Sequence, residues 1–330
     1  MNTTFGWMFR LLAIVLVPLC AFGAKAQGKD AWPSKPIRFV VPFAAGGSID
    51  VLARLMGRHL EARLGQSFII ENRTGAGGTV GADFVARAPA DGYTFLFTAQ
   101  GPLVLNPFLM KHLPYRAETA FTPVTMVAEA PNVLVSNLDF PVSSFVELRA
   151  FAKSNPDKMT FATQGVGTTG HVTGELINQR TGIGLTHVAY QGFPRALTDV
   201  LAGRVGMMIG DTINLLPRIH SGQLRPIAIA SAKRSAVLPD VPTFAEAGYP
   251  EIVSGPWYAV LAPAGTSIEI RRKLADEMRH VLGQREVQEK FRELGVESRD
   301  PTPEQFDAYL KAEYRRWGAV IQKAGITVNN

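Results

Sequence analysis

Three glycine-rich turns, each between an apolar strand pattern and a helical pattern, constrain this chain most. They are residues 42–48 (PFAAGGS), 72–79 (NRTGAGGT) and 164–170 (QGVGTTG). A helix start leaves about four backbone N–H groups unpaired and carries roughly half a positive charge. Glycine before it lets the main chain approach a ligand closely, so each turn is a candidate cradle for an anion. Three such turns, without an evident catalytic constellation beside them, predict that the protein binds a small anion rather than transforming it.

The first 26 residues predict a secretory signal peptide that is cleaved near Ala26. Arg10 is the only charge before an apolar run over residues 11–22, and Ala24-Lys25-Ala26 offers a cleavage site of the small-x-small type. The run is too short to span about 30 Å of hydrocarbon; an uncleaved membrane anchor is the alternative. The only cysteine lies inside this segment, and export without a disulfide favours the bacterial periplasm.

Composition excludes several classes of protein. Of the 330 residues, 46% are hydrophobic and 19% are charged, which is typical of a globular chain long enough for two domains rather than of a disordered one. Loss of Arg10 and Lys25 with the signal lowers the formal net charge from +6 to +4. The sequence has no block of basic residues interleaved with aromatic ones, so we expect no nucleic-acid partner.

Strand and helix patterns alternate in two runs, which predicts mostly parallel sheets covered by helices. We assign residues 27–137 and 255–330 to a first lobe and 138–254 to a second, crossed by two connecting segments. Hinge closure is then expected, with a cleft at the carboxyl ends of strands. Helices are predicted at 48–64, 144–155, 194–202, 213–221, 267–282, 286–294 and 303–324. Two more are predicted to follow the second and third glycine turns and to end at residues 87 and 181. Strands are predicted at 37–42, 68–71, 93–98, 122–128, 133–136, 159–163, 186–190, 205–209, 224–230 and 257–262.

Motifs for cofactors and metals are weak. Residues 165–170 match the letters of the dinucleotide fingerprint, but the next strand ends in residues 188–192 (VAYQG), without the carboxylate that a ribose requires. The second turn lacks the Gly-Lys-Ser/Thr of a phosphate loop. His171 and Glu175 are spaced as two metal ligands on one helix face, but no third ligand is evident, so a turn or surface role is favoured. We therefore expect neither a cofactor nor a metal.

Enzyme motifs are also missing. The sequence has no Gly-x-Ser-x-Gly elbow and no cysteine after the signal. We therefore predict a protein that is not an enzyme, with a periplasmic hydrolase using Asp50, His171 or Asp211 as the alternative.

Hydroxyl and carboxylate side chains at the helix starts have two readings. Ser48, Thr79, Thr168 and Thr169 are suited to cap helices, and a hydroxyl there can also donate to a carboxylate ligand. Asp211 follows a predicted strand, and either caps the next helix or meets an ammonium or hydroxyl group of a ligand.

A series of segments together resembles a known family. They are residues 32–37 (WPSKPI), 41–50 (VPFAAGGSID), 71–78 (ENRTGAGG), 90–94 (ADGYT), 165–171 (GVGTTGH), 190–192 (YQG) and 238–243 (LPDVPT). The pattern is similar to that of the Bug receptors, the periplasmic solute-binding proteins of the tripartite tricarboxylate transporter family. It covers essentially the whole chain after the signal.

The resemblance implies a two-lobed, type II periplasmic-binding α/β fold, in which each lobe is a mixed sheet covered by helices and two strands cross between the lobes. It implies a monomer that holds a small organic carboxylate between the lobes, partly through bridging waters. The partners would be membrane permease subunits or, alternatively, a periplasmic sensor kinase domain. The effector-sensing domain of a regulator shares the fold, but the signal peptide and the missing DNA-binding helices disfavour it.

Mapped onto this sequence, the resemblance places ligand contacts in the three turns and beyond them. Tyr190, Gln191 and Asp211 would shape the distal end of the ligand. The full set of predicted ligand-binding residues is Phe43, Ala44, Ala45, Gly46, Gly47, Ser48, Gly77, Gly78, Thr79, Gln100, Gln164, Gly167, Thr168, Thr169, Tyr190, Gln191 and Asp211.

The chain departs from the family pattern at three positions. The family often has Pro where this chain has Thr74, and Asn where it has Thr79. Gln191 stands where Lys is common, and loss of that cation makes a monocarboxylate or amide ligand better supported than a dicarboxylate.

Overall fold

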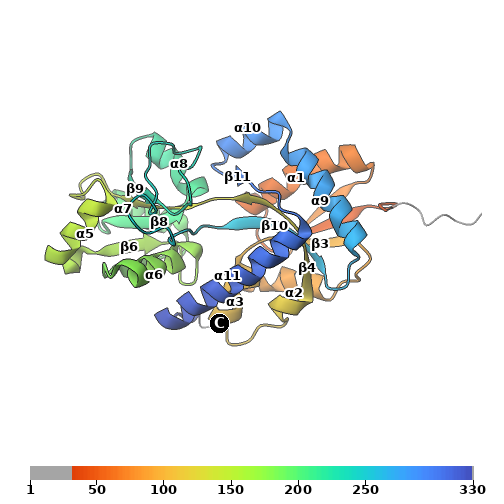
Figure 1. Cartoon of the computed structure of the whole chain (residues 1–330), viewed down its shortest axis with the longest axis horizontal. Coiled ribbons are helices and arrows are strands. Elements are labelled where there is room, and N and C mark those ends of the chain that lie inside the picture. The colour runs from red at the N-terminus through yellow and green to blue at the C-terminus, as the bar shows by residue number, and fades with distance from the viewer. Residues whose placement is uncertain (1–31, 329–330) are drawn as a thin grey trace, which may run out of the picture. The chain divides into compact units, whose positions relative to one another are not determined.

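The computed structural model describes residues 32–328, so the predicted signal peptide and its cleavage near Ala26 lie outside the described residues. The first of two sheets has six strands in the order β11-β4-β10-β3-β1-β2 (Figure 1). Their bounds are β1 Ile37–Val41, β2 Phe68–Asn72, β3 Thr94–Ala99, β4 Phe121–Glu129, β10 Trp257–Pro263 and β11 Glu297–Ser298. Strand β1 runs parallel to β2 and β3, whereas β10 is antiparallel to both of its neighbours.

The second sheet has five strands in the order β7-β6-β8-β5-β9. They are β5 Asn132–Ser136, β6 Thr160–Thr163, β7 Thr186–Ala189, β8 Met207–Asp211 and β9 Arg225–Ile229. Strand β6 is parallel to β7 and β8, and β5 is antiparallel to β8 and β9. Both sheets are therefore mixed, as the resemblance implies, and the expectation of mostly parallel sheets was wrong. The second sheet begins at β5; the lobe boundaries at residues 138 and 255 stay a prediction.

Helices cover both sheets (Figure 1). Around the first sheet they are α1 Ser48–Leu64, η1 Ala76–Gly78, α2 Thr79–Ala86, η2 Gly101–Leu105, α3 Asn106–Leu109, α4 Ala117–Ala120, α9 Ile268–Leu282, α10 Arg285–Glu293 and α11 Pro303–Ala324. Around the second they are α5 Phe145–Ser154, η3 Pro156–Lys158, α6 Thr169–Thr181, α7 Phe193–Leu201 and α8 Thr212–His220. The C-terminal helix α11 packs on β4 of the first sheet and also contacts α6 of the second.

Two segments connect the sheets and run side by side. The first joins β4 to β5 and the second leads into β10. The Ala130 N–H donates to the Pro256 carbonyl at 2.9 Å, and the Asn132 N–H donates to the Ser254 carbonyl at 2.8 Å. Because the chain re-enters the first sheet through this second segment, β10 runs antiparallel to β3.

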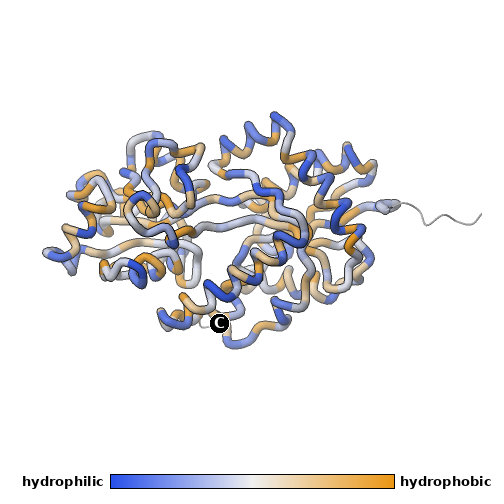
Figure 2. Tube along the Cα trace, in the orientation of Figure 1, coloured by the Kyte–Doolittle hydropathy of each residue, from blue (hydrophilic) through white to orange (hydrophobic). Residues whose placement is uncertain are grey.

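Aromatic side chains form part of the first core. Phe39 on β1 is fully buried and packs against Phe95 and Phe97, with ring centroids 6.2 and 5.6 Å away. By contrast, α10 buries only Val287 and Phe291 among its residues, and Figure 2 shows hydrophilic stretches along the outer helices. Most side chains of α10 therefore form a solvated helix face.

Candidate ligand-binding site

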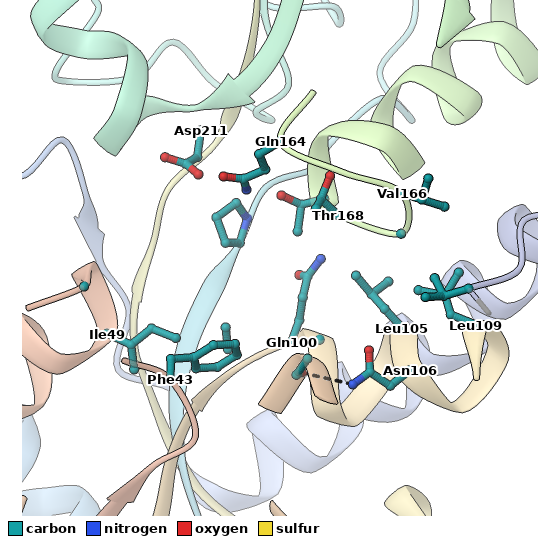
Figure 3. A pocket seen from close by; sticks show the side chains of 18 of the residues that line it. Phe43, Ile49, Gln100, Leu105, Asn106, Leu109, Gln164, Val166, Thr168 and Asp211 are labelled. Atoms are coloured by element: carbon teal, nitrogen blue, oxygen red, sulfur yellow. Dashed lines mark hydrogen bonds between the residues drawn. The ribbon is translucent and has the colours of Figure 1, made fainter. Parts of the chain in front are cut away.

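Each sheet with its helices forms one lobe, and residues of both lobes line a cavity of about 460 Å³ (Figure 3). The first lobe supplies the turn after β1, the second glycine turn, the end of β3 and the helical segment after it. The second lobe supplies the third glycine turn and the end of β8. The lining residues are Phe43, Gly47, Ser48, Ile49, Ala76, Gly77, Ala99, Gln100, Gly101, Leu105, Asn106, Leu109, Met110, Gln164, Val166, Gly167, Thr168, Thr169, Asp211, Asn214, Pro256, Tyr258 and Val328.

The turn before α1 is held by a buried carboxylate. Asp50, only 3% exposed, accepts hydrogen bonds from the Gly46 N–H at 2.9 Å, from Arg54 Nε at 2.9 Å and from Asn72 Nδ2 at 3.0 Å. Burial opposes ionisation of Asp50, but the hydrogen bonds from Arg54, Gly46 and Asn72 outweigh it, so the pKa of this carboxyl lies below its usual value. Asp50 therefore fixes the shape of the turn, and it does not line the cavity.

The start of α1 presents main-chain donors to the cavity. Gly47 occupies the N-cap position with φ −75° and ψ 166°, and no side chain caps the helix. Ser48 is the first helical residue and lines the cavity with Ile49. The N–H groups of a first helical turn have no partner inside the helix.

The second turn adopts left-handed backbone at Gly77, with φ 60°, and at Gly78, with φ 90°. Gly77 lines the cavity and its carbonyl accepts from Asn106 Nδ2 at 3.1 Å. A Cβ at Gly78 would lie 2.8 Å from Pro102 Cγ. Gly78 is therefore required for packing, and Gly77 is the residue of this pair that faces the cavity.

The third turn brings the second lobe against the first. Gly167 has φ 73°, and a Cβ there would lie 2.8 Å from Leu109 Cδ1 and 3.1 Å from Val328 Cγ2. Thr168 is the N-cap of α6, yet its hydroxyl donates to the Gly165 carbonyl at 2.8 Å and makes no cap bond. A second helix start, without a side-chain cap, thus faces the same cavity.

The capping reading of the four hydroxyl residues was wrong. Ser48, Thr79 and Thr169 are the first residues of their helices rather than caps, and Thr168 makes no cap bond. The carboxylate of Asp211 does cap α8, because it accepts from the Asn214 N–H at 3.0 Å. The capping reading of Asp211 is therefore confirmed, although this residue also lines the cavity.

His171 holds the third turn through a hydrogen bond to its main chain. Its Nδ1 accepts from the Gly167 N–H at 3.1 Å, and its ring stacks on that of His187 at 3.8 Å between centroids. Burial lowers the pKa of His171 to about 4; burial and the neighbouring His171 lower that of His187 to about 4. Glu175 lies 3.9 Å from His171 Nε2, and within residues 32–328 no three His, Cys, Asp or Glu side chains form a metal-binding group.

The cavity is poor in charge. Over the described part of the chain, its lining contains no Lys, Arg or His, and Asp211 is its one acidic residue. Burial raises the pKa of Asp211, against the opposing effect of its hydrogen bonds with Asn214. Burial likewise raises the pKa of the Tyr258 hydroxyl, on β10 of the first sheet, well above its usual value. An anion bound here has to rely on N–H and O–H donors rather than on a cation.

Gln100 stands out among the polar lining residues. Its side chain is 1% exposed, and neither its amide nitrogen nor its amide oxygen has a hydrogen-bond partner in the described structure. Figure 3 shows the amide end directed into the cavity, toward Thr168 of the other lobe.

The structure brings together ten of the predicted site residues around the cavity: Phe43, Gly47, Ser48, Gly77, Gln100, Gln164, Gly167, Thr168, Thr169 and Asp211. The seven others do not line it: Ala44, Ala45, Gly46, Gly78, Thr79, Tyr190 and Gln191. The Tyr190 hydroxyl donates to Asp199 at 2.8 Å, and the exposed Gln191 accepts from Arg195 at 3.1 Å. Here both side chains make contacts within their own lobe.

Sequence reasoning missed the apolar side of the cavity. Leu105 and Leu109 belong to η2 and α3, in a stretch for which no helix or strand was predicted. The available signal was Pro at a helix start, which occurs at Pro102 and Pro107.

Comparison with known proteins decides the family. A model of the tripartite tricarboxylate transporter family receptor matches residues 52–326. The chain belongs to this receptor family. It is 38% identical over 320 residues to protein BugT of Bordetella pertussis, which covers 96% of this chain and 98% of that protein. The resemblance inferred from the sequence is thus confirmed, and with it the class of periplasmic solute-binding receptor.

Solved structures of relatives confirm the two-lobed α/β fold. An R. palustris protein solved with adipate is 36% identical, with a TM-score of 0.77, covering 90% of this chain and 100% of the other. MatC from Rhodopseudomonas palustris, solved with bound malate, is 33% identical with a TM-score of 0.72, covering 88% and 99%. Within residues 32–328, no helix combines the length and the apolar character needed to cross a membrane.

Proposed function

We propose that this receptor captures a small organic carboxylate between its lobes and delivers it to membrane permease subunits of a tripartite tricarboxylate transporter. One observation carries the proposal. Two helix starts without side-chain caps, those of α1 and α6, face one cavity from opposite lobes. This arrangement is suited to an anion held between the lobes, because each helix start offers unpaired N–H groups and a partial positive charge.

The carboxylate would be held by main-chain donors. The first-turn N–H groups around Ser48 and Thr169 have no partners within their helices, and both helix dipoles favour negative charge at these ends. The hydroxyl of Ser48 is a further donor in the lining. Hydrogen bonds to an ionised acceptor are roughly twice as strong as neutral ones, which compensates for the lack of a cation in the cavity.

The ligands of the solved relatives support this chemistry, since adipate and malate both carry carboxylates. The apolar residues Leu105, Leu109 and Val166 would contact the carbon skeleton of the ligand. Closure of the lobes about the paired connecting segments would remove water from the carboxylate and strengthen its hydrogen bonds.

The remaining parts of the proposal concern export and partners. We expect a monomer that reaches the periplasm after cleavage near Ala26 and works without a cofactor, a metal or catalysis. The signal pattern of the first 26 residues and the membership of a receptor family support this.

Thermal unfolding tests the function. Protein recovered from the periplasm is unfolded and refolded to remove any bound ligand, then heated with mono-, di- and tricarboxylates or with amino acids. A ligand at 100 times its Kd adds about 2.7 kcal/mol to stability, which raises the Tm by several degrees. A rise with carboxylates alone is expected. No rise with any carboxylate, or release of altered ligand after overnight incubation, would overturn the proposal.

A further inference from the structure

The amide of Gln100 is a buried polar group without a partner. Both of its hydrogen-bonding atoms are inaccessible to solvent, and neither forms a hydrogen bond with any described residue. A buried donor or acceptor left unpaired costs about 1–3 kcal/mol. Figure 3 shows this amide directed into the cavity, so a polar group of a bound ligand is placed to supply the missing partner.

The main chain of Gln100 is anchored by hydrogen bonds. Its carbonyl accepts from the N–H groups of Leu103, at 3.0 Å, and Val104, at 2.8 Å, so the residue is anchored at the start of η2. The side chain emerges from the end of β3, next to Ala99, which is paired with Tyr258 of β10. A central position in the sheet and an anchored backbone therefore fix the point from which this side chain reaches the cavity.

We propose that Gln100 selects a ligand whose second polar group is a neutral primary amide, so that the receptor prefers a monoamide of a dicarboxylic acid to the diacid itself. The inference rests on the proposed function, in which helix starts hold the carboxylate. A primary amide donates and accepts side by side. It pairs with Gln100 through two parallel hydrogen bonds, one in each direction, and leaves neither side-chain atom unsatisfied.

A second carboxylate fits this position less well. A carboxylate only accepts hydrogen bonds, so it pairs with the Gln100 nitrogen and leaves the Gln100 oxygen facing a negative charge. Asp211 adds to this discrimination, because it lines the same cavity and no basic side chain accompanies it among the described lining residues. Burial of a second anion without a cation is costly.

Calorimetric titration of the refolded protein tests the proposal with matched probes. The probes are succinate, glutarate and adipate, each compared with its own monoamide, so that length is constant within a pair and only the terminal group changes. In at least one pair the monoamide is expected to bind at least tenfold more tightly than the diacid. This comparison needs no variant, so it holds even where a substitution disturbs folding.

Gln100→Met then assigns the preference to this residue. Methionine is close in length but cannot pair with an amide, so the ratio of the two affinities is expected to fall by at least fivefold. Gln223→Met is the matched control, because Gln223 is exposed and does not line the cavity; its ratio should stay that of the unaltered protein.

The outcomes distinguish failure of this inference from failure of the proposed function. Diacids that bind as tightly as their monoamides overturn the selection by Gln100 and leave carboxylate capture standing. The same holds for a preference that survives in Gln100→Met. A protein that binds none of these carboxylates overturns both.

Discussion

The main-chain N–H of Gly167 donates to Nδ1 of His171 at 3.1 Å, so a turn that lines the cavity is held by an imidazole that must be neutral to accept. The ring also stacks against His187. Protonation of either ring would place charge in a buried stack, and protonation of Nδ1 would remove the acceptor for Gly167. The shape of this turn is therefore linked to pH.

Stability is predicted to fall as the pH falls from about 6.5 to about 4. Burial lowers the pKa of His171 from 6.5 to about 4. Between these values the unfolded chain binds a proton that the folded chain does not, so this contribution is complete above pH 6.5 and is lost toward pH 4. For His171 it is on the order of 3 kcal/mol at full extent. Glu175 opposes it in part, since burial raises the pKa of that carboxyl.

Urea denaturation at several pH values checks this prediction. In His171→Asn the amide oxygen still accepts from Gly167 but does not titrate, so the stability curve should flatten between pH 6.5 and 4. His280→Asn is the control, because His280 is exposed on α9. A curve as steep in His171→Asn as in the unaltered protein would contradict the role of this ring.

Gly47→Leu is predicted to weaken carboxylate binding by tenfold or more while the fold persists. The backbone at Gly47, with φ −75°, accepts any residue, and a Cβ there lies 3.3 Å from the Ala44 carbonyl. The larger side chain would occupy space at the helix start where the anion belongs. Calorimetry gives the affinity and thermal unfolding gives the stability. Gly283→Leu, at a backbone φ of −75° on the C-cap of α9, is the matched control. Equal affinity in both variants would show that the start of α1 does not belong to the binding site.

Asp50→Ala is predicted to destabilise the protein by about 1–3 kcal/mol, because it leaves the Gly46 N–H and Asn72 without their buried acceptor. The pKa of Asp50 is lowered in the fold, so its contribution is present above about pH 4 and is lost below it. Asp83→Ala is the comparison, since it breaks only the exposed pair with Arg87 and should cost under about 1 kcal/mol. Equal losses in urea denaturation would show that Asp50 does not hold the turn.

Local patterns in the sequence predicted the glycine turns and the helices well, for a physical reason. The bounds of α1 and α11 agree with the predicted ranges 48–64 and 303–324. These helices carry their own signals: an amphipathic face, and for α11 a capping box at Thr302 with Pro303 next to it. Gly167 likewise adopts a positive φ, which glycine tolerates best, so the local sequence alone indicates this turn.

Features that depend on distant parts of the chain were not predictable in the same way. The direction of β10 follows from its re-entry from the second lobe, which no local pattern records. The contact of Tyr190 is a second example, since its hydroxyl donates to Asp199, a partner nine positions away on another element. The missing partner of Gln100 is visible only when its surroundings in three dimensions are known.

The two connecting segments leave no room for a side chain at residue 255. A Cβ on Gly255 would lie 2.3 Å from the Ala130 carbonyl, 2.7 Å from Pro131 Cα and 2.9 Å from the Asn132 nitrogen. These are main-chain atoms, which cannot turn away as a flexible side chain does. The hydrogen bonds from Ala130 and Asn132 to the opposite segment depend on this close approach.

Gly255→Ala is therefore predicted to cost about 1–3 kcal/mol through overpacking and to change ligand affinity, because the segments that it forces apart connect the two lobes that line the cavity. Gly283→Ala is the matched control: a Cβ there meets its nearest atom at an ordinary 3.6 Å. Chemical denaturation measures the first effect and calorimetry with the best carboxylate the second. Loss of stability with unchanged affinity would show that close packing of the segments does not influence ligand binding. An unchanged stability would contradict the close packing itself.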